Sequence, residues 1–303
     1  MRKKFTYQSE YDEIDSIILK RPKDAFVSKE VISAQWQDLA FVNPPDLDQA
    51  IHEYDQFEQL IIKKCSHVYH LPVAEEVTMD SIYCRDAALI TDHGLILCNM
   101  GKAQRALEPQ AIRSLCSTHD LPILGEIKSP GTVEGGDTAW ITSNTMAVGH
   151  TYRTNDDGIN QLRQLLMPLD IEVVVAEMPH YKGPGDVFHL MSVFSPVDRD
   201  LALVYSPLMP ISFRNHLLDL HYHLIEVPAA EFESMGCNVL AIAPRHCIMV
   251  SGNPQTAAAL RHAGCIVDEY PGSEISIKGG GGPTCLTRPL RRKTIDTGFW
   301  SMD

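Results

Sequence analysis

The sequence predicts an α/β fold in which five ββαβ modules close into one pseudo-symmetric ring. The first observation behind this prediction is a repeat: four segments share the same order of hairpin, helix and strand, with a period of roughly sixty residues. The second is that the two ends of the chain carry complementary parts of a fifth module. No linker rich in proline, glycine or serine interrupts the repeat, so we expect a single domain over residues 1–303.

Each of the four complete modules begins with two strands around a turn, as alternating apolar residues and turn-forming residues indicate. These hairpins are expected over Ala87–Asn99, Asp137–Asn155, Met191–Ser206 and Asn238–Ser251. The spacing of apolar residues then predicts helices near Gln104–Ser117, Asn155–Met167, Ser212–Tyr222 and Pro254–Ala263. Each module ends on a short strand, at Leu121–Ile127, Ile171–Ala176, Leu224–Val227 and Cys265–Tyr270.

The N-terminal module lacks the first strand of its hairpin. It carries one strand at Ser16–Lys20, a helix near Leu47–Lys64 and a strand at Val68–Leu71. The C-terminal segment Thr284–Leu290 is left over and is expected to supply the missing strand, which closes the ring. Residues 22–45 hold few apolar alternations and several charges, so we predict a surface loop that acts as a lid over a site.

The composition is that of an acidic globular protein, with 44% hydrophobic and 21% charged residues. A net charge of -13 argues against a nucleic-acid partner, which requires a basic surface. No apolar run is long enough to span a bilayer, and the charged N-terminus lacks the apolar core of a signal peptide. We therefore expect a cytoplasmic protein without a membrane partner. The sequence leaves open whether copies of the chain form a homo-oligomer.

One of the eight cysteines stands apart from the others. The stretch Lys278-Gly-Gly-Gly-Gly-Pro-Thr-Cys285 presents it after four glycines, which cost backbone entropy and fit where the backbone passes close to another group. Taken alone, this stretch is equally consistent with a flexible turn before a buried cysteine and with a presented nucleophile. The other cysteines lie mostly in apolar segments and form no CxxC, so we expect reduced thiols and no zinc site.

Polar residues precede the first hairpin strand of each module. In chain order they are Asp86, Glu134, His189, the turn Gly236-Cys237-Asn238, and Cys285. Equivalent positions in a pseudo-symmetric ring converge at one end of its axis. Two carboxylates, a histidine and a cysteine are then expected in one cavity, and these groups suffice for covalent catalysis.

These motifs resemble the guanidino-group-modifying enzymes, the superfamily of arginine deiminase, dimethylargininase and the amidinotransferases. The similar motifs, in this order over nearly the whole chain, are Cys84-Arg85-Asp86, Glu134-Gly-Gly-Asp137, His189-Leu-Met-Ser192 and the glycine-rich loop that ends in Cys285. The resemblance implies a single catalytic domain folded as a five-bladed α/β propeller, the pentein fold. It also implies a small guanidino compound as substrate, and neither a metal nor an organic cofactor.

The resemblance implies a role for each catalytic residue. Cys285, as a thiolate, attacks the guanidinium carbon, and His189 protonates the departing amine and later activates water. Glu134 accepts hydrogen bonds from the guanidinium and orients His189. Asp86 takes the other guanidinium nitrogens in a carboxylate pair.

Two arginines match the positions that bind the substrate α-carboxylate in dimethylargininase-like members. They are Arg105 and Arg153, and the fork geometry of arginine suits a carboxylate. For Arg105 the alternative interpretation is a solvated residue at a helix start. Asp137 is expected to be a structural hydrogen-bond acceptor. The basic segment Arg288–Lys293 is expected to be a solvated end, with Arg288 close enough to Cys285 to touch the cavity.

The motifs give conflicting indications of the reaction. Met191 stands where arginine-deiminase-like members carry an aspartate that binds the unsubstituted guanidinium, and a methionine there tolerates a substituted nitrogen. Cys84-Arg85-Asp86, in contrast, is closer to the Thr-Arg-Asp of arginine deiminases. We favour hydrolysis of an Nω-substituted arginine to citrulline and an alkylamine through a covalent amidine on Cys285. Deimination of arginine, hydrolysis or dihydrolysis of another guanidino compound, and amidino transfer are the alternatives.

A non-catalytic function is a further alternative, because some five-bladed α/β propellers are binding factors, including a ribosome anti-association factor. Those proteins lack the Cys/His/Glu set that is present here. The acidic net charge also disfavours ribosomal RNA as a partner. The sequence therefore favours an enzyme, a hydrolase of C–N bonds in linear amidines.

Overall fold

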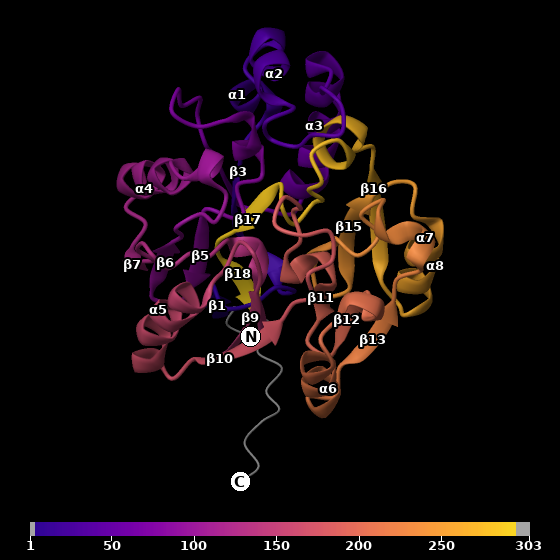
Figure 1. Ribbon diagram of the computed structural model, residues 1–303. Helices are drawn as coiled ribbons and strands as arrows, with labels where there is room; N and C mark the ends of the chain where they lie inside the picture. The colour runs from indigo at the N-terminus through magenta and orange to yellow at the C-terminus, as the bar shows by residue number, and fades with distance from the viewer. Residues whose placement is uncertain (1–3, 295–303) are drawn as a thin grey trace.

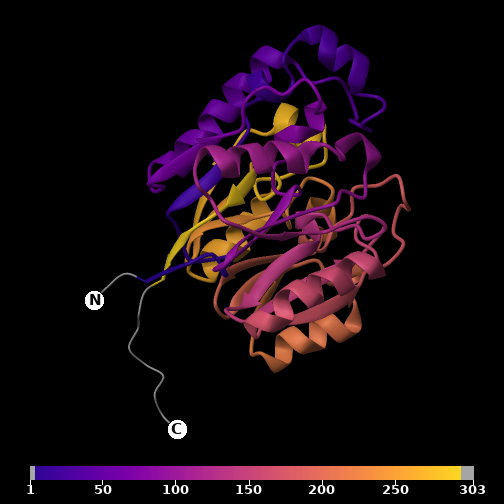
Figure 2. The same cartoon turned by 90° about the vertical axis from the view of Figure 1, so that its left-hand side faces the viewer.

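Five three-stranded sheets, each with one antiparallel and one parallel pairing, make up most of the computed structural model, which describes residues 4–294. Helices lie on the outside and follow one another around the molecule in chain order (Figure 1). The strands run through the interior, as the second view shows (Figure 2). The expectation of one domain over 1–303 includes residues 1–3 and 295–303, which lie outside the described residues.

The four complete modules are confirmed, each with two antiparallel strands, a helix, and a third strand parallel to the second. Their first two strands are β5 (Ala88–Thr91) and β6 (Gly94–Leu97), β8 (Thr138–Thr142) and β9 (Thr145–His150), β11 (Phe194–Asp198) and β12 (Leu201–Val204), β14 (Leu240–Ala243) and β15 (His246–Val250). Their helices are α4 (Glu108–Thr118), α5 (Asp156–Leu166), α6 (Ile211–Asp219) and α8 (Pro254–His262). Their last strands are β7 (Ile123–Glu126), β10 (Glu172–Glu177), β13 (His223–Glu226) and β16 (Ile266–Tyr270).

The two ends of the chain meet in the fifth sheet, as predicted. Strand β17 (Thr287–Pro289) pairs antiparallel with β3 (Ser16–Leu19), with Arg288 opposite Ile18. Strand β3 in turn pairs parallel with β4 (His67–His70). Because β17 follows Cys285 by two residues, closure of the fifth sheet fixes the position of that cysteine relative to the N-terminal module.

Helix α3 (Leu47–Ile62) shows how the outer helices attach to the strands. Asp46 caps its N-terminus, because the carboxylate accepts a hydrogen bond from the Gln49 N–H at 2.9 Å. Its buried apolar residues recur every three or four positions, so one stripe of the helix faces the core. They are Ala50, Tyr54, Phe57 and Ile61, none more than 1% exposed.

The predicted surface loop at residues 22–45 contains two short helices, α1 (Pro22–Ala25) and α2 (Lys29–Gln35). The segment also contributes to the core, since Phe26, Ile32, Leu39 and Phe41 are buried. The prediction of a surface loop was therefore wrong where the segment forms these helices and enters the core. Apolar residues spaced over two short helices give too little periodicity to be recognised in a sequence.

Other short elements were also not predicted. Strands β1 (Lys4–Thr6), β18 (Arg292–Thr294) and β2 (Glu13–Ile14) form a sixth, antiparallel sheet. A four-residue helix α7 (Ala229–Phe232) precedes β14, and a single π-helical turn at Ser273–Ile277 precedes the glycine run. Among residues 4–294, no helix has both the length and the apolar character needed to cross a bilayer.

Candidate active site

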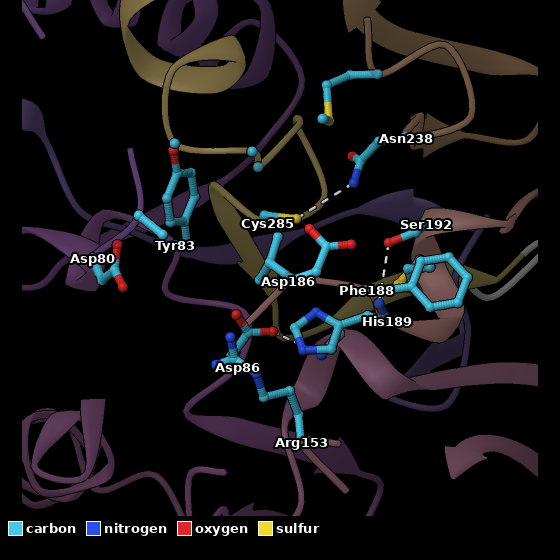
Figure 3. A pocket seen from close by; sticks show the side chains of 18 of the residues that line it. Asp80, Tyr83, Asp86, Arg153, Asp186, Phe188, His189, Ser192, Asn238 and Cys285 are labelled. Carbon is cyan, nitrogen blue, oxygen red and sulfur yellow. Dashed lines mark hydrogen bonds between the residues drawn. The ribbon is translucent and has the colours of Figure 1, made fainter. Parts of the chain in front are cut away.

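A cavity of about 310 Å³ lies where the modules meet, within the size range of small-molecule sites. The predicted residues Asp86, His189 and Cys285 line it, together with Arg105 and Arg153 (Figure 3). Glu134 is fully buried behind His189 and does not line the cavity. The structure thus brings every predicted site residue into one cluster.

The glycine run before Cys285 is required by close packing. A Cβ on Gly281 would lie 2.4 Å from Tyr83 Cε1, and a Cβ on Gly282 would lie 2.5 Å from Asn238 Cγ. Gly280 has a φ of 75°, a left-handed conformation that favours glycine. The run therefore lets the backbone pass against Tyr83 and Asn238, and the interpretation as a flexible turn was wrong.

The Cys285 thiol is partly exposed to the cavity and is held by Asn238. The Asn238 side-chain amide donates to Cys285 Sγ at 3.3 Å, and its Oδ1 accepts from the Thr284 N–H at 3.0 Å. Burial raises the pKa of the Cys285 thiol, as does the negative charge of Asp86, while the Asn238 hydrogen bond lowers it. A cation that enters the cavity therefore stabilises the thiolate and lowers the pKa of the Cys285 thiol.

His189 and Glu134 form a buried pair. Their Nε2 and Oε2 atoms are 2.8 Å apart, and Glu134 Oε1 accepts from the Lys102 N–H at 3.0 Å. Burial lowers the pKa of His189, but the carboxylates of Asp137, Asp86 and Glu134 outweigh burial and raise it to about 9. For Glu134 burial acts to raise the pKa, and His189 overcomes this and lowers it to about 2. The imidazole is therefore protonated near neutral pH and its partner is ionised.

Gly136 fits tightly between His189 and Asp86. A Cβ on Gly136 would lie 2.4 Å from His189 Nδ1 and 2.8 Å from Asp86 Oδ1. Its N–H donates to Asp86 Oδ1 at 2.8 Å. The glycines of Glu134-Gly-Gly-Asp137 therefore allow the carboxylate and the imidazole to converge from two modules.

Arg105 is buried and bound by several acceptors. Its Nη1 donates to Asp86 Oδ2 at 2.6 Å, and its Nε and Nη2 donate to the two oxygens of Glu108 at 2.8 Å each. Nη2 also donates to the Tyr83 carbonyl. Arg105 is only 2% exposed, so the interpretation as a solvated residue was wrong, and its contacts orient Asp86.

Arg153 has more donor capacity left. Its Nη1 lies 3.6 Å from Glu134 Oε1 and is buried without a hydrogen-bond partner among residues 4–294.

Asp137, expected to be structural, accepts from the Thr151 hydroxyl at 2.7 Å and from the Leu190 N–H at 3.0 Å. Burial raises its pKa to about 6. Asp137 thus joins the β9 hairpin to the turn that carries His189.

Several lining residues were not identified from the sequence. Asn238 belongs to a turn recognised as equivalent to the other site positions, yet no role was assigned to its amide. Asp80 also lines the cavity and pairs with Lys102 at 2.6 Å, and Asp186 adds another carboxylate to the lining (Figure 3). An aromatic wall is formed by Tyr181, Phe188 and Phe232. Of these residues, only Asn238 could have been identified from the sequence, because it occupies a repeat position equivalent to those of the other site residues.

The ligand atoms of Asp86, Glu134 and His189 lie within 4.8 Å of one another, close enough to hold a metal ion. However, the atoms that would bind the metal already take part in hydrogen bonds. Arg105 and the Gly136 N–H occupy Asp86, while His189 and the Lys102 N–H occupy Glu134. The guanidinium groups of Arg105 and Arg153 also repel a cation, so these residues suit a hydrogen-bonded network better than a metal site.

The chain is similar to known proteins in sequence and in fold. Residues 37–292 match the family model for N,N dimethylarginine dimethylhydrolase, eukaryotic. The chain is 28% identical over 291 residues to the uncharacterized protein YkgA of Bacillus subtilis, covering 94% of both chains. It is also 25% identical to an arginine deiminase of Listeria monocytogenes over 260 residues, 70% of this chain but only 61% of the deiminase.

Solved structures share the fold at lower sequence identity. A cysteine-to-serine mutant of the Pseudomonas aeruginosa dimethylargininase with citrulline superposes with a TM-score of 0.74 and 22% identity, covering 92% of this chain and 99% of that one. An amidinotransferase of Microseira wollei gives a TM-score of 0.79 at 15% identity, covering 97% and 99%. The family model covers most of the chain, and the chain therefore belongs to the N,N dimethylarginine dimethylhydrolase family, within the pentein superfamily of guanidino-modifying enzymes.

Proposed function

We propose that this protein hydrolyses the guanidino group of an Nω-substituted arginine and releases citrulline and an alkylamine. The observation that carries the proposal is the convergence of the Cys285 thiol, the His189 imidazole and the Asp86 carboxylate on one cavity of small-molecule size. In this proposal the planar, cationic guanidinium binds between the carboxylate and the sulfur. Family membership supports a guanidino compound as the substrate class.

The proposed reaction has two halves. In the first, Cys285 Sγ attacks the guanidinium carbon as a thiolate, and His189 gives its proton to the substituted nitrogen, so the C–N bond breaks and the amine leaves. An amidine remains bonded to sulfur. In the second, neutral His189 takes a proton from water, whose oxygen attacks the amidine carbon. The C–S bond then breaks, and the ureido product and the thiolate form.

The surrounding residues hold these groups in place. Glu134 orients His189 and stabilises its protonated form, because the two are paired at 2.8 Å and Glu134 is fully buried. Asp86 binds guanidinium nitrogens while Arg105 fixes its orientation. Arg153 lines the cavity and binds the substrate α-carboxylate through guanidinium nitrogens other than the Nη1 that faces Glu134, and Arg105 contributes only by sharing Nη1 between Asp86 and the ligand.

We further propose that the five sheets are the blades of one pseudo-symmetric five-bladed propeller, a single catalytic domain. Residues 22–45 act as its lid, since Leu39, Ala40 and Val42 line the cavity. All eight cysteines in the described residues are unpaired, which suits a cytoplasmic, reducing setting.

Arginine deimination is the second candidate, and Asp186 favours it. This carboxylate lines the cavity and is available to the nitrogens of an unsubstituted guanidinium. Met191 favours the substituted substrate, because its side chain is apolar, buried and part of the same lining. Asp186 therefore favours arginine as the substrate, and Met191 favours an Nω-substituted arginine.

The test is incubation with dimethylarginine and, separately, with arginine, followed by assay of the ureido product and of the released amine. We expect citrulline and dimethylamine from dimethylarginine, at a higher kcat/KM than citrulline and ammonia from arginine. Cys285→Ser should be inactive, whereas Cys65→Ser, at a partly buried cysteine away from the cavity, should keep full activity. Absence of a ureido product from any guanidino compound, or an active Cys285→Ser, overturns the proposal.

A further inference from the structure

Three buried arginines gather beside the active site on segments far apart in the sequence. Arg85, Arg288 and Arg292 are only 0%, 5% and 1% exposed. They come from the residue before Asp86, from β17 and from β18, and both strands lie near the middle of the molecule (Figure 1). The expectation that the segment Arg288–Lys293 is a solvated end was therefore wrong.

The carboxylates near these arginines are too few to balance them. Arg85 Nη2 donates to Glu10 Oε2 at 2.8 Å, and all three guanidinium groups act on Glu10 and lower its pKa against the effect of burial. Asp12 acts on Arg292. Three guanidinium groups thus share Glu10, with Asp12 acting on Arg292, and an uncompensated buried charge is costly.

The hydrogen-bond donors are also only partly used. Arg288 Nη1 donates to the Ala88 carbonyl at 3.1 Å, and Arg292 Nη1 donates to the Ala241 carbonyl at 2.9 Å. Five guanidinium nitrogens of Arg85, Arg288 and Arg292 are buried without any hydrogen-bond partner among residues 4–294. Unsatisfied charged donors in the interior require an acceptor.

We propose that a small monovalent anion with the chemistry of chloride binds among Arg85, Arg288 and Arg292. A spherical anion accepts N–H groups from several directions at once, and it supplies the missing negative charge. Burial lowers the pKa of Arg288 to about 9 and that of Arg292 to about 10, and the charge of Arg85 adds to both effects. A bound anion relieves this penalty and keeps all three side chains ionised.

The site connects two segments that carry active-site residues. Arg85 directly precedes Asp86, and its N–H donates to the Cys285 carbonyl at 3.3 Å. Arg288 follows Cys285 by three residues. The anion therefore stabilises the junction between these segments, and this role does not depend on the identity of the substrate.

The direct test is diffraction from crystals of the wild-type protein soaked in sodium bromide, at a wavelength where bromide scatters anomalously. We expect an anomalous peak in contact with Arg85, Arg288 and Arg292. Density at this position without anomalous signal, or no density there, would mean that water or packing alone satisfies the arginines and would overturn the proposal.

A second test measures Tm as sodium gluconate is replaced by sodium chloride at constant ionic strength. The wild type should gain stability with chloride. Glu10→Gln should reduce the chloride concentration for half-maximal stabilisation by on the order of tenfold, because it removes a competing negative charge. Arg292→Met should lose the dependence, and Arg261→Met, at an exposed arginine, should retain it. Equal chloride dependence in Glu10→Gln and wild type contradicts the proposal even if Arg292→Met does not fold.

Discussion

The Asn238 side-chain amide donates a hydrogen bond to Cys285 Sγ at 3.3 Å, so the nucleophilic thiol is held by a residue of a different module. The carbonyl oxygen of the same amide accepts from the Thr284 N–H and hydroxyl, at 3.0 and 2.8 Å. One side chain thus fixes the backbone before Cys285 and stabilises its thiolate. This arrangement leads to the first prediction.

Asn238→Asp replaces the donor with a negative charge beside sulfur and should raise the pKa of Cys285 further. We expect the rate of alkylation by iodoacetamide at neutral pH to fall at least about tenfold, since a hydrogen bond to a charged group contributes about 1.5–3 kcal/mol. The pH profile of alkylation should shift to higher pH. Asn160→Asp, on the exposed face of α5, is the matched control and should alkylate like the wild type. An unchanged profile in Asn238→Asp would exclude this role for the amide.

The pH dependence of kcat/KM should be bell-shaped with its maximum above neutral pH. Because the pKa of Cys285 is raised, chiefly by burial, the thiolate fraction and the rate increase as pH rises from neutral. The pKa of His189 is about 9, and once the pH exceeds both this value and the raised pKa of the thiol, loss of the imidazolium proton that the leaving amine needs is no longer offset by more thiolate, so the rate falls. Steady-state kinetics over this range measure both limbs. A maximum on the acid side of neutral would contradict the assignment.

Glu134→Gln should lower the maximum of this profile and shift it to lower pH. Asp137, Asp86 and Glu134 together raise the pKa of His189 against the effect of burial, so loss of the Glu134 charge moves this pKa down toward the ordinary value of 6.5. At pH values between 6.5 and 9 the variant should lose activity more than at acid pH. Glu126→Gln, at a half-exposed carboxylate on β7, serves as the control. A loss of activity that is equal at all pH values would indicate a structural role for Glu134 instead.

Gly136→Ala should reduce kcat strongly without unfolding the protein. The added methyl group must displace His189 Nδ1 or Asp86 Oδ1, which lie 2.4 and 2.8 Å from its position. A displacement of about 1 Å in an active site can cost roughly 100-fold in rate. Gly185→Ala is the matched control, because Gly185 lines the same cavity and its Cβ would meet nothing within 4 Å. Similar kinetics for the two variants would show that the convergence at Gly136 is not needed.

The modules could be predicted because their information is local. Alternating apolar residues and turn residues identify hairpins such as β5–β6, and the order of the elements identifies the repeat. Asp86, Glu134, His189 and Cys285 occupy equivalent positions of that repeat, so the sequence alone is enough to group them. Their equivalent positions in the repeat therefore predicted that these residues lie together, although they are far apart in the sequence.

The same reasoning failed where burial depends on long-range packing. Arg288 and Arg292 belong to a charged segment that is typical of a solvated end, yet β17 and β18 pair with N-terminal strands and bury both side chains. Arg105 likewise became buried through its pairs with Asp86 and Glu108. Charge alone cannot indicate burial when the compensating carboxylates lie elsewhere in the sequence.

Met191→Asp should shift the preference of the enzyme from substituted toward unsubstituted guanidines. Met191 is buried in the cavity lining next to the turn of His189, so an aspartate there is costly unless a guanidinium N–H pairs with it. Arginine provides N–H groups on both terminal nitrogens, whereas a dimethylated nitrogen provides none. We expect the ratio of kcat/KM for arginine to that for dimethylarginine to rise by about tenfold or more.

Met191→Leu keeps the apolar surface and volume and should leave this ratio unchanged. Asp186→Asn tests the competing carboxylate: if Asp186 binds the guanidinium, this variant loses activity on arginine more than on dimethylarginine. A ratio that responds to Asp186→Asn but not to Met191→Asp would place the selective contact on the loop before His189. Substrate choice would then depend on the loop that carries Asp186, and no longer on Met191.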